Sequence, residues 1–568
     1  MNPPASLYLR RRAGVALGAL CAWLMFPNLV WLSVGHGIAV WTAGLLVPAA
    51  LLVLIFALSG RAPWFACLLL APFAAMAPAE AFYIHGYLRP SSAQVLASLF
   101  ATNPGESREY LGGLLAPLVA CMLVGVVLAA LAAWWTGRAR LRWRVAWGLA
   151  IALPMSLIAF LTCYGAAAGR VAQRLTEATT ALNGQITAGY PFGMIERLIE
   201  YRQQWSAMRE QAAHLDGFRF HARRAVSIAR RQIYVLVIGE ASRRDHWQLF
   251  GYGRPTNPAL VRESNLVPIT DMVTSWPESI AAIPMILTRK PSTASWSSLW
   301  HEASILRAMQ EAGFETWWIS NQLPIGKFDS PVSVYALEAQ HLQFMRHEAW
   351  SAPGSYDEDL LQPLREAMRS SNDDLFIVLH MMGSHQAYDL RYPDSFLRFR
   401  PVKSDAKSGT PLYLRDRNSY DNTILYTDHV LAQIIDTLRA SGATSALWFE
   451  SDHGETLPTP TCPREGHGFG TRYDFQIPAL FWYSDAYAKT FPARAAALRN
   501  NARKRSMSAD TFESLIDMAD VTFPGHDEAH SLFSPGWRYQ PRLVHGPRQA
   551  DFDRATFEPR CEIVGPRN

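Results

Sequence analysis

Residues able to bind a metal ion follow three short apolar runs in the second half of the chain. They are Glu240 after the first run, His380 and His385 after the second, Asp452, His453 and Glu455 after the third, and His467 further on. Carboxylates and imidazoles are ligands that zinc accepts. Singly, each has a structural alternative, since a glutamate after a strand can cap a helix and a His-Gly pair can form a turn. Their joint placement predicts a metal site.

A zinc ion held by such ligands acts as a Lewis acid on a phosphoryl or sulfuryl group and lowers the pKa of a bound hydroxyl. That chemistry requires a nucleophile. Ser242, two residues after Glu240, is the first candidate. It lies, however, where a strand is expected to turn into a helix, and serine is a favoured helix N-cap. A capping role for Ser242 is therefore the preferred interpretation, with the nucleophile as the alternative.

The elements that must position these residues alternate between strands and helices from residue 232 onward. Strand-like runs occupy 232–238, 316–320, 375–379 and 445–449, and helix-like stretches occupy 298–313 and 422–442. Both helical stretches end at a glycine, a common stop signal. The alternation predicts an α/β domain with a mostly parallel sheet. In such sheets the chemistry lies beyond the carboxyl ends of the strands, where the candidate ligands are placed.

The first 166 residues have a different character, because apolar runs dominate them. Five runs are long enough to cross a bilayer, which takes about 20 apolar residues. They lie near 13–34, 38–58, 63–83, 111–135 and 145–166. Five such runs with almost no charge are hard to bury inside a soluble protein. We therefore expect a five-helix transmembrane domain over 1–166.

The arginines between these runs predict the orientation of the chain in the membrane. One set of flanks holds Arg10, Arg11, Arg12, Arg61, Arg138, Arg140, Arg142 and Arg144, whereas the opposite loops hold only Arg89 and Arg108. By the positive-inside rule, the N-terminus is cytoplasmic. Five crossings then place the rest of the chain outside the inner membrane. The first run is interpreted as an anchor, since it is too long for a cleaved signal.

The remaining chain divides into a polar, helix-favouring connector over 167–231 and a globular domain over 232–568. The first connector helix either lies on the membrane surface or packs as an ordinary linker. The net charge of +5 is modest, and no basic stripe indicates nucleic-acid binding. Of six cysteines, only Cys462 and Cys561 lie outside the membrane runs. An oxidising compartment permits a disulfide between them, but the sequence leaves the pairing open.

Four motifs carry a resemblance to a known family. They are "VIGEASRRDHWQLFGYGRPTNP", "LHMMGSHQAYDLRYP", "YDNTILYTDHVLAQIIDTL", and "SDHGE" followed by "GHG". In this order they resemble the phosphoethanolamine transferases of Gram-negative inner membranes, which include the lipid A enzymes behind polymyxin resistance and a core-oligosaccharide branch. The resemblance implies five membrane helices before a periplasmic domain of the alkaline phosphatase/sulfatase superfamily. We expect a monomer.

The resemblance also implies a nucleophile that the motif residues alone do not reveal. In the family it is a threonine about forty residues after the first motif's glutamate and five before a proline. Counting back from Pro284 gives Ser279, a departure that keeps the hydroxyl and loses a methyl. Thr274 and Ser275 are alternative hydroxyls, and Ser279 could instead cap a helix in an inactive protein. The implied zinc ligands are Glu240, Ser279, Asp452 and His453.

Further residues match family positions around the substrate. His385 and His467 match positions that hold the phosphate of the intermediate or a second zinc, and Glu455 is a candidate ligand of that second site. His380 matches a position near the donor head group. In the loop "SLFATNPGESREY", Thr102 and Glu106 match donor contacts, and a carboxylate suits the ethanolamine ammonium. One zinc is expected, and the number of ions in turnover stays open.

The resulting hypothesis is a two-step transfer through a phosphoethanolamine–Ser279 intermediate, from phosphatidylethanolamine to a lipopolysaccharide or other envelope acceptor. One rival is a phosphoglycerol transferase, whose anionic donor would not need Glu106. A second is a sulfatase or phosphatase-type hydrolase, which needs no membrane half. A third is a metal-binding membrane sensor, against which a hydroxyl at Ser279 beside a full ligand set argues. The acceptor is not encoded in these motifs.

Overall fold

The computed structural model describes residues 3–33, 38–87, 90–91, 114–167, 171–226, 228–294, 301–324, 330–345, 356–405, 408–546 and 548–567. The predicted donor contacts Thr102 and Glu106 lie outside these residues. The chain divides into two compact units, Met1–Gln203 and Gln204–Asn568, and each is considered by itself.

The first unit is helical. Its helices are α1 (Pro3–Ser33), α2 (Ile38–Leu58), α3 (Pro63–Leu69), α4 (Ala71–Tyr87), α7 (Leu115–Arg138), α8 (Val145–Ala166) and α9 (Val171–Ala188), and α10 (Phe192–Leu215) crosses the boundary to the second unit. Small residues let the helices approach closely. A Cβ on Gly125 of α7 would lie 2.0 Å from the Ala74 carbonyl oxygen of α4, and one on Gly148 of α8 would lie 2.1 Å from Ala57 Cβ of α2. Such small-residue contacts are typical of membrane helices.

Three described helical segments are long and apolar enough to cross a membrane: Leu7–Ser33, Leu115–Arg138 and Val145–Ala166. The pair α3–α4, bent by 44°, makes a fourth if it is one span, and Gly44–Leu58 of α2 is a shorter apolar helix. Large apolar side chains such as Leu123 and Leu153 are exposed, as a lipid-facing surface requires. Apolar N-terminal helices are thus present, and the count of five spans stays a prediction.

The second unit is built on an eight-stranded sheet with the order β5-β4-β6-β2-β7-β8-β3-β9. The strands are β2 (Gln232–Gly239), β3 (Leu266–Val273), β4 (Glu315–Ser320), β5 (His341–Phe344), β6 (Leu375–His380), β7 (Thr444–Ser451), β8 (Gln476–Tyr483) and β9 (Arg505–Met507). The run from β5 to β7 is parallel, and β8 is antiparallel to both of its neighbours. This confirms the predicted α/β domain with a mostly parallel sheet.

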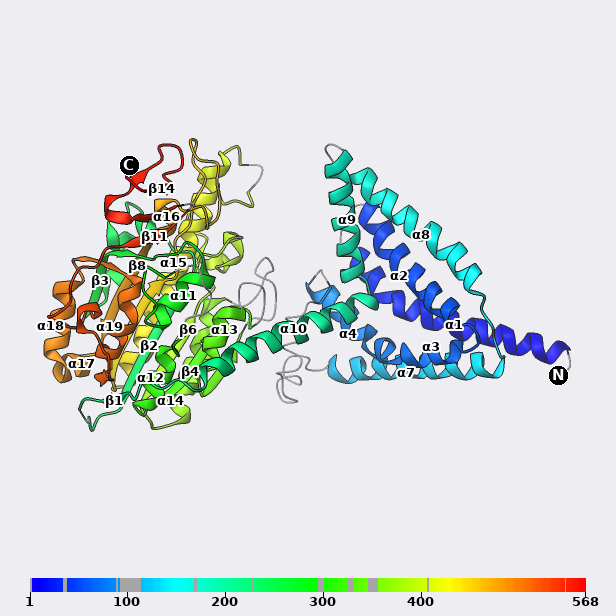
Figure 1. Ribbon diagram of the computed structural model, residues 1–568, viewed down its shortest axis with the longest axis horizontal. Helices are drawn as coiled ribbons and strands as arrows, with labels where there is room; N and C mark the ends of the chain where they lie inside the picture. Colours follow the sequence, from blue (N-terminus) through cyan, green and yellow to red (C-terminus); the bar gives the residue numbers. More distant parts are fainter. Residues whose placement is uncertain are drawn as a thin grey trace. The chain divides into compact units, whose positions relative to one another are not determined.

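Helices cover the sheet on both faces (Figure 1). The described helices of this unit are α11 (Ser279–Leu287), α12 (Ile305–Glu311), α13 (Ser330–Ala336), α14 (Leu361–Ser370), α15 (Leu412–Ala440), α16 (Arg472–Phe475), α17 (Asp485–Thr490), α18 (Pro492–Asn501) and α19 (Thr511–Met518). Three two-stranded ribbons complete the unit: β1 (Arg223–Arg224) with β10 (Val521–Thr522), β11 (Leu543–His545) with β12 (Gln549–Asp551), and β13 (Thr556–Phe557) with β14 (Val564–Gly565).

The sequence of β2 is an almost unbroken apolar run because both faces of this strand are buried in the core. Every residue of β2 is buried. Val235 and Val237 pack in one cluster with side chains of α14 and α15, while Tyr234 contacts Phe314 and Tyr487. A parallel strand with both faces covered has no polar side.

Two local predictions need correction. The helix expected at 298–313 begins at Ile305, because Ser304 caps it by accepting a hydrogen bond from the Leu306 N–H. Ser242 is not a helix N-cap. Only short 3-10 turns follow it, and its hydroxyl accepts a hydrogen bond of 2.8 Å from Trp247 Nε1.

Candidate metal centre and nucleophile

The register of two neighbouring strands brings the first two candidate ligands together. Gly239 at the end of β2 lies opposite Ser451 at the end of β7, so Glu240 and Asp452 leave the sheet side by side. Asp452 Oδ1 is fixed by the backbone N–H groups of Ala241, at 3.2 Å, and His453, at 2.7 Å. The other oxygen, Oδ2, is left for another partner.

His453 completes a three-residue group. One ligand atom each from Glu240, Asp452 and His453 lies within 4.8 Å of the others. His453 Nδ1 lies 2.7 Å from the Gly454 carbonyl oxygen, which can only accept, so the proton sits on Nδ1 and Nε2 carries the lone pair. Nε2 lies 3.4 Å from Glu240 Oε1 and 3.4 Å from Asp452 Oδ2. Burial lowers the pKa of His453, which keeps the imidazole neutral, as a metal ligand requires.

The group contains buried carboxylate oxygens that lack hydrogen-bond donors among the described residues, and a cation could pair with them. Within the part of the chain that the structure describes, Glu240 Oε1 and Asp452 Oδ2 are buried and accept no hydrogen bond. Burial and the neighbouring Asp452 carboxylate raise the pKa of Glu240 well above its usual value. Buried carboxylate oxygens without donors are costly unless a cation pairs with them. The residues therefore fit a zinc ion, whose ligands in proteins include carboxylate oxygen and imidazole nitrogen.

Ser279 is the hydroxyl that the fold brings to this group. It is the first residue of α11, and it is only partly buried. Ser279 Oγ donates to Glu240 Oε2 at 3.2 Å and lies 3.1 Å from His453 Nε2. Among the described contacts, Ser275 Oγ has no hydrogen-bond partner, and Thr274 Oγ1 reaches Trp276 O and Ser508 Oγ rather than the ligand set. The geometry favours Ser279 over both alternatives.

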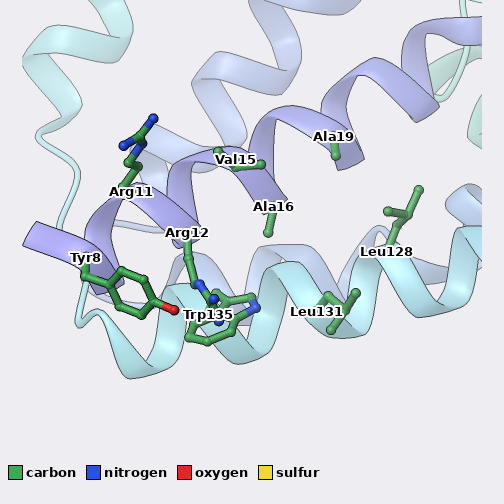
Figure 2. A pocket seen from close by; sticks show the side chains of 9 residues that line it. All are labelled: Tyr8, Arg11, Arg12, Val15, Ala16, Ala19, Leu128, Leu131 and Trp135. Carbon is green, nitrogen blue, oxygen red and sulfur yellow. The ribbon is translucent and has the colours of Figure 1, made fainter. Parts of the chain in front are cut away.

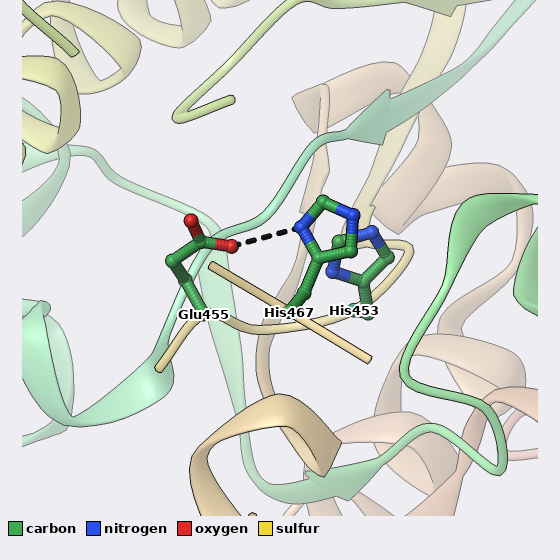
Figure 3. Close-up of side chains that lie close together, drawn as sticks. All are labelled: His453, Glu455 and His467. Carbon is green, nitrogen blue, oxygen red and sulfur yellow. Dashed lines mark hydrogen bonds and ion pairs between the residues drawn. The ribbon is translucent and has the colours of Figure 1, made fainter. Parts of the chain in front are cut away.

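A second group shares His453 with the first. Ligand atoms of His453, Glu455 and His467 also lie within 4.8 Å of one another (Figure 3). Glu455 Oε2 lies 3.0 Å from His467 Nδ1, and Tyr388 donates its hydroxyl to Glu455 Oε1 at 2.7 Å. Burial alone would lower the pKa of His467, but the hydrogen bond and charge of Glu455 raise it to about 9. His467 therefore holds a proton at neutral pH.

The other two predicted histidines lie further from Ser279. The His385 ring centre is 6.0 Å from that of His467, and burial lowers the pKa of His385 to about 3. His380 ends β6, where its Nδ1 lies 3.3 Å from Ser320 Oγ, and burial lowers its pKa to about 4. Within the described residues, the side-chain partners of Ser279 are Glu240 and His453, whereas His380 Nδ1 faces Ser320. Both imidazoles are neutral at neutral pH.

Two residues of the site were not predicted. Gln322 Nε2 donates to Met381 O at 2.9 Å and to Glu240 Oε2 at 3.4 Å. It lies two residues beyond β4, so the rule that chemistry gathers at carboxyl ends of parallel strands could have found it. Tyr388, which donates to Glu455, begins the 3-10 turn Tyr388–Leu390 after β6. It lies within the quoted motif "LHMMGSHQAYDLRYP", but the sequence assigned it no role.

A disulfide between Cys462 and Cys561 answers the question that the sequence left open. Cys462 lies between Glu455 and His467. The bond therefore ties the tip of the loop that carries these two residues to the C-terminal segment.

Comparisons with known proteins agree with this fold. The sulfatase family matches residues 232–521. Phosphoethanolamine transferase EptC of Escherichia coli (strain K12) is 29% identical over 321 residues, which are 55% of this chain and 55% of EptC, so the chain spans about half the length of that relative. Phosphoethanolamine transferase CptA of Salmonella typhimurium is 25% identical over 497 residues, 84% of this chain and 83% of CptA. The crystal structure of the C-terminal periplasmic domain of EptC from Escherichia coli in complex with Zn superposes with a TM-score of 0.53 at 25% identity, and covers 61% of this chain and 98% of that domain.

Proposed function

Because this chain belongs to the sulfatase family and its relatives include the phosphoethanolamine transferases EptC and CptA, we propose that it transfers phosphoethanolamine from phosphatidylethanolamine to an acceptor in the cell envelope. The observation that carries the proposal is the position of Ser279 Oγ, 3.2 Å from Glu240 Oε2 and 3.1 Å from His453 Nε2. A partly exposed hydroxyl against a metal-ligand set is the arrangement that covalent phosphoryl transfer needs.

In the first step, Ser279 Oγ attacks the phosphorus of the donor, and the bond from phosphorus to the diacylglycerol oxygen breaks. The serine proton passes to Glu240 Oε2, which already accepts it as a hydrogen bond. The departing diacylglycerol oxygen takes a proton from His467, which holds one at neutral pH. Phosphoethanolamine remains bonded to Oγ.

In the second step, an acceptor hydroxyl attacks the same phosphorus, the bond from phosphorus to Oγ breaks, and Oγ recovers its proton from Glu240. The acceptor's proton passes to His467, so both groups return to their starting state. The N-terminus of α11, where Ser279 lies, favours the negative charge of the phosphate.

Glu240, Asp452 and His453 would hold a zinc ion, which when bound polarises the phosphoryl group and lowers the pKa of the serine hydroxyl. We assign one ion to this group. Both oxygens of Glu455 are occupied, by the Tyr388 hydroxyl and by His467. That pairing favours a role for Glu455 in orienting His467 over a role as ligand of a second ion.

The cellular setting belongs to the same proposal. The solved relative is a periplasmic domain, and a lipid donor requires a catalytic unit beside the membrane. We therefore place the apolar helices in the inner membrane, the second unit in the periplasm, and the protein as a monomer there. Lipid A and the lipopolysaccharide core are the proposed acceptors.

The proposal is tested by mass spectrometry of the Ser279 peptide after the purified, zinc-loaded protein is incubated with phosphatidylethanolamine. We expect a phosphoethanolamine adduct on Ser279 in the native protein and in Ser279→Thr, which keeps a hydroxyl, and none in Ser279→Ala. Ser275→Ala is the matched control and should form the adduct normally. An adduct on Ser275 would keep the activity and overturn the nucleophile. An adduct only with phosphatidylglycerol would identify a phosphoglycerol transferase, and release of free phosphoethanolamine without any acceptor would indicate a hydrolase.

A further inference from the structure

A groove with no place in the proposed chemistry runs between α1 and α7 within the first unit (Figure 2). The groove is open to the surroundings and has a volume of about 520 Å³. Tyr8, Arg11 and Arg12 lie at one end of it, together with Trp135. Its remaining lining is small or aliphatic, including Val15 of α1 and Leu128 and Leu131 of α7. No acidic side chain lines it among the described residues.

Arg12 occupies the seam between the two helices. Its guanidinium carbon lies 4.4 Å from the ring centre of Tyr8 and 5.0 Å from that of Trp135, and Figure 2 shows it reaching from α1 toward the indole of α7. Arg12 and Arg11 are exposed, and neither forms an ion pair within the described part of the chain. Stacking on two aromatic rings fixes the orientation of the Arg12 guanidinium through its face. The N–H donors at its edge take no part in this stacking. Among the described residues the donors of Arg12 have no hydrogen-bond or ion-pair partner, which leaves them for an anion.

The groove changes from polar to apolar along the helix axes. Tyr and Trp are typical of the membrane–water interface, where the head groups lie. Val15 and Leu131 are exposed to 68% and 45%, further along the same helices. The rise of about 1.5 Å per residue places Ala19, at the far end of the lining, roughly 10 Å from Arg12. The groove thus places the positive charge of Arg12 at the depth of the lipid head groups and apolar side chains at the depth of the acyl chains.

We propose that the α1–α7 groove binds one anionic phospholipid of the cytoplasmic leaflet. Its phosphate contacts the Arg12 guanidinium, Arg11 adds positive charge at the rim, and an acyl chain lies along Val15 and Leu131. The cytoplasmic side follows from the arginines of this end of α1. A zwitterionic lipid is disfavoured, because the lining offers no carboxylate to its ammonium group. This site rests on membrane insertion and is independent of the proposed transfer reaction.

The test is native mass spectrometry of the full chain, titrated with phosphatidylglycerol and, separately, with phosphatidylethanolamine of the same acyl chains. We expect tighter binding of phosphatidylglycerol to the native protein. Arg12→Gln should weaken it about fivefold, the factor that about 1 kcal/mol per membrane-facing arginine gives at 25 °C. Arg138→Gln is the matched control. Arg138 also stacks on an indole, 4.9 Å from the Trp134 ring, on the same helix but outside the groove lining.

Equal affinity of the native protein for the two lipids would overturn the proposal, and so would an equal loss in Arg12→Gln and Arg138→Gln. Arg12→Lys is a second variant, chosen because a long cationic side chain can still contact Trp135 of α7. It keeps the charge but not the planar fork, so its affinity for phosphatidylglycerol should fall between those of the native protein and Arg12→Gln. If Arg12→Lys binds no better than Arg12→Gln while both retain the native melting temperature, charge recognition at this position is excluded.

Discussion

At the scale of single residues, Glu240 uses its two carboxylate oxygens differently. Oε2 accepts hydrogen bonds from Ser279 and Gln322, whereas Oε1 accepts none within the described residues. One oxygen can therefore bind a cation while the other receives the serine proton. Ser242 has no such freedom, because its hydroxyl accepts the Trp247 indole N–H and its backbone N–H is bound to Ser451 Oγ. The proposed nucleophile, Ser279, therefore comes from a different element, although a serine lies two residues after Glu240.

A histidine paired with two carboxylates of α19 predicts how stability depends on pH. Burial would lower the pKa of His526, but its ion pair with Asp517, at 3.2 Å, and its hydrogen bond with Glu513 raise it to about 10. Since the folded pKa lies above the unfolded value of about 6.5, this stabilisation is complete below about pH 6.5 and is lost as pH rises toward 10. We expect His526→Gln to lower the free energy of unfolding by about 2 kcal/mol at pH 6 and by much less at pH 10.

The measurement is denaturant unfolding of native protein and variant in detergent, followed by tryptophan fluorescence at both pH values. An equal difference at pH 6 and pH 10 would show that His526 is neutral in the folded state. His301→Gln is a suitable control, because the His301 side chain is 68% exposed and its substitution should leave the profile unchanged.

The candidate metal ligands are the most predictable residues of the site, since strand ends in a parallel sheet meet at one edge. Glu240, Asp452 and His453 needed only that rule. Ser279 lies on a helix that follows β3, and nothing in its local sequence distinguishes it from Ser275. Only the resemblance to a family identified it, and its role stays a prediction that the structure favours by distance.

At the scale of elements, the loop after β6 is held against Glu240 through Gly383. This glycine has a φ of +50°, and a Cβ there would lie 2.7 Å from the Glu240 carbonyl oxygen and 2.8 Å from its nitrogen. We expect Gly383→Ala to displace Glu240, to weaken zinc binding by at least about tenfold and to cost about 2–4 kcal/mol of stability, as crowding in a packed core does. Zinc affinity by competition with a chelating dye, with the melting temperature, checks both effects.

Gly409→Ala is the control that separates backbone strain at a positive φ from the steric clash with Glu240 as the cause of the loss of stability and zinc affinity. Gly409 has a φ of +71°, yet its added Cβ would meet nothing within 4 Å. It should show only the backbone penalty of about 1 kcal/mol and an unchanged zinc affinity. If Gly383→Ala behaves in the same way, the close approach to Glu240 has no role in building the site.

The four predicted strands are the neighbours β4, β6, β2 and β7, and the strands beyond β7 were missed. Both β3 and β8 contain a proline, Pro268 and Pro478, and a proline within an apolar run argues against a strand. The structure accommodates them in an antiparallel pair with an irregular register between Ile269 and Met272. The start of α15 was missed for another reason. Its first turns bury polar side chains such as Asp416 and Asn418, so they lack the apolar periodicity that indicates a helix.

At the scale of the whole molecule, the chain divides at Gln203 within α10, so α9 belongs with the apolar helices. The sequence placed a separate connector over 167–231, and that three-part division stays a prediction. Composition marks where apolar runs stop, but it does not show which polar helix packs against them. α9 contacts both α2 and α8, which a sequence of mixed polarity could not indicate.

The orientation of the chain in the membrane follows from charge and from the parity of crossings. The N-terminal arginines predict a cytoplasmic start, and the predicted five spans, an odd number, would place Gln204–Asn568 outside. The Cys462–Cys561 disulfide supports this side, since such bonds persist in oxidising compartments. We expect green fluorescent protein to fluoresce when it is fused at the N-terminus and to stay dark at the C-terminus, where an alkaline phosphatase fusion should instead be active. A fluorescent C-terminal fusion would mean an even number of crossings, and the predicted lipid donor would then have to reach the catalytic unit from the cytoplasmic leaflet.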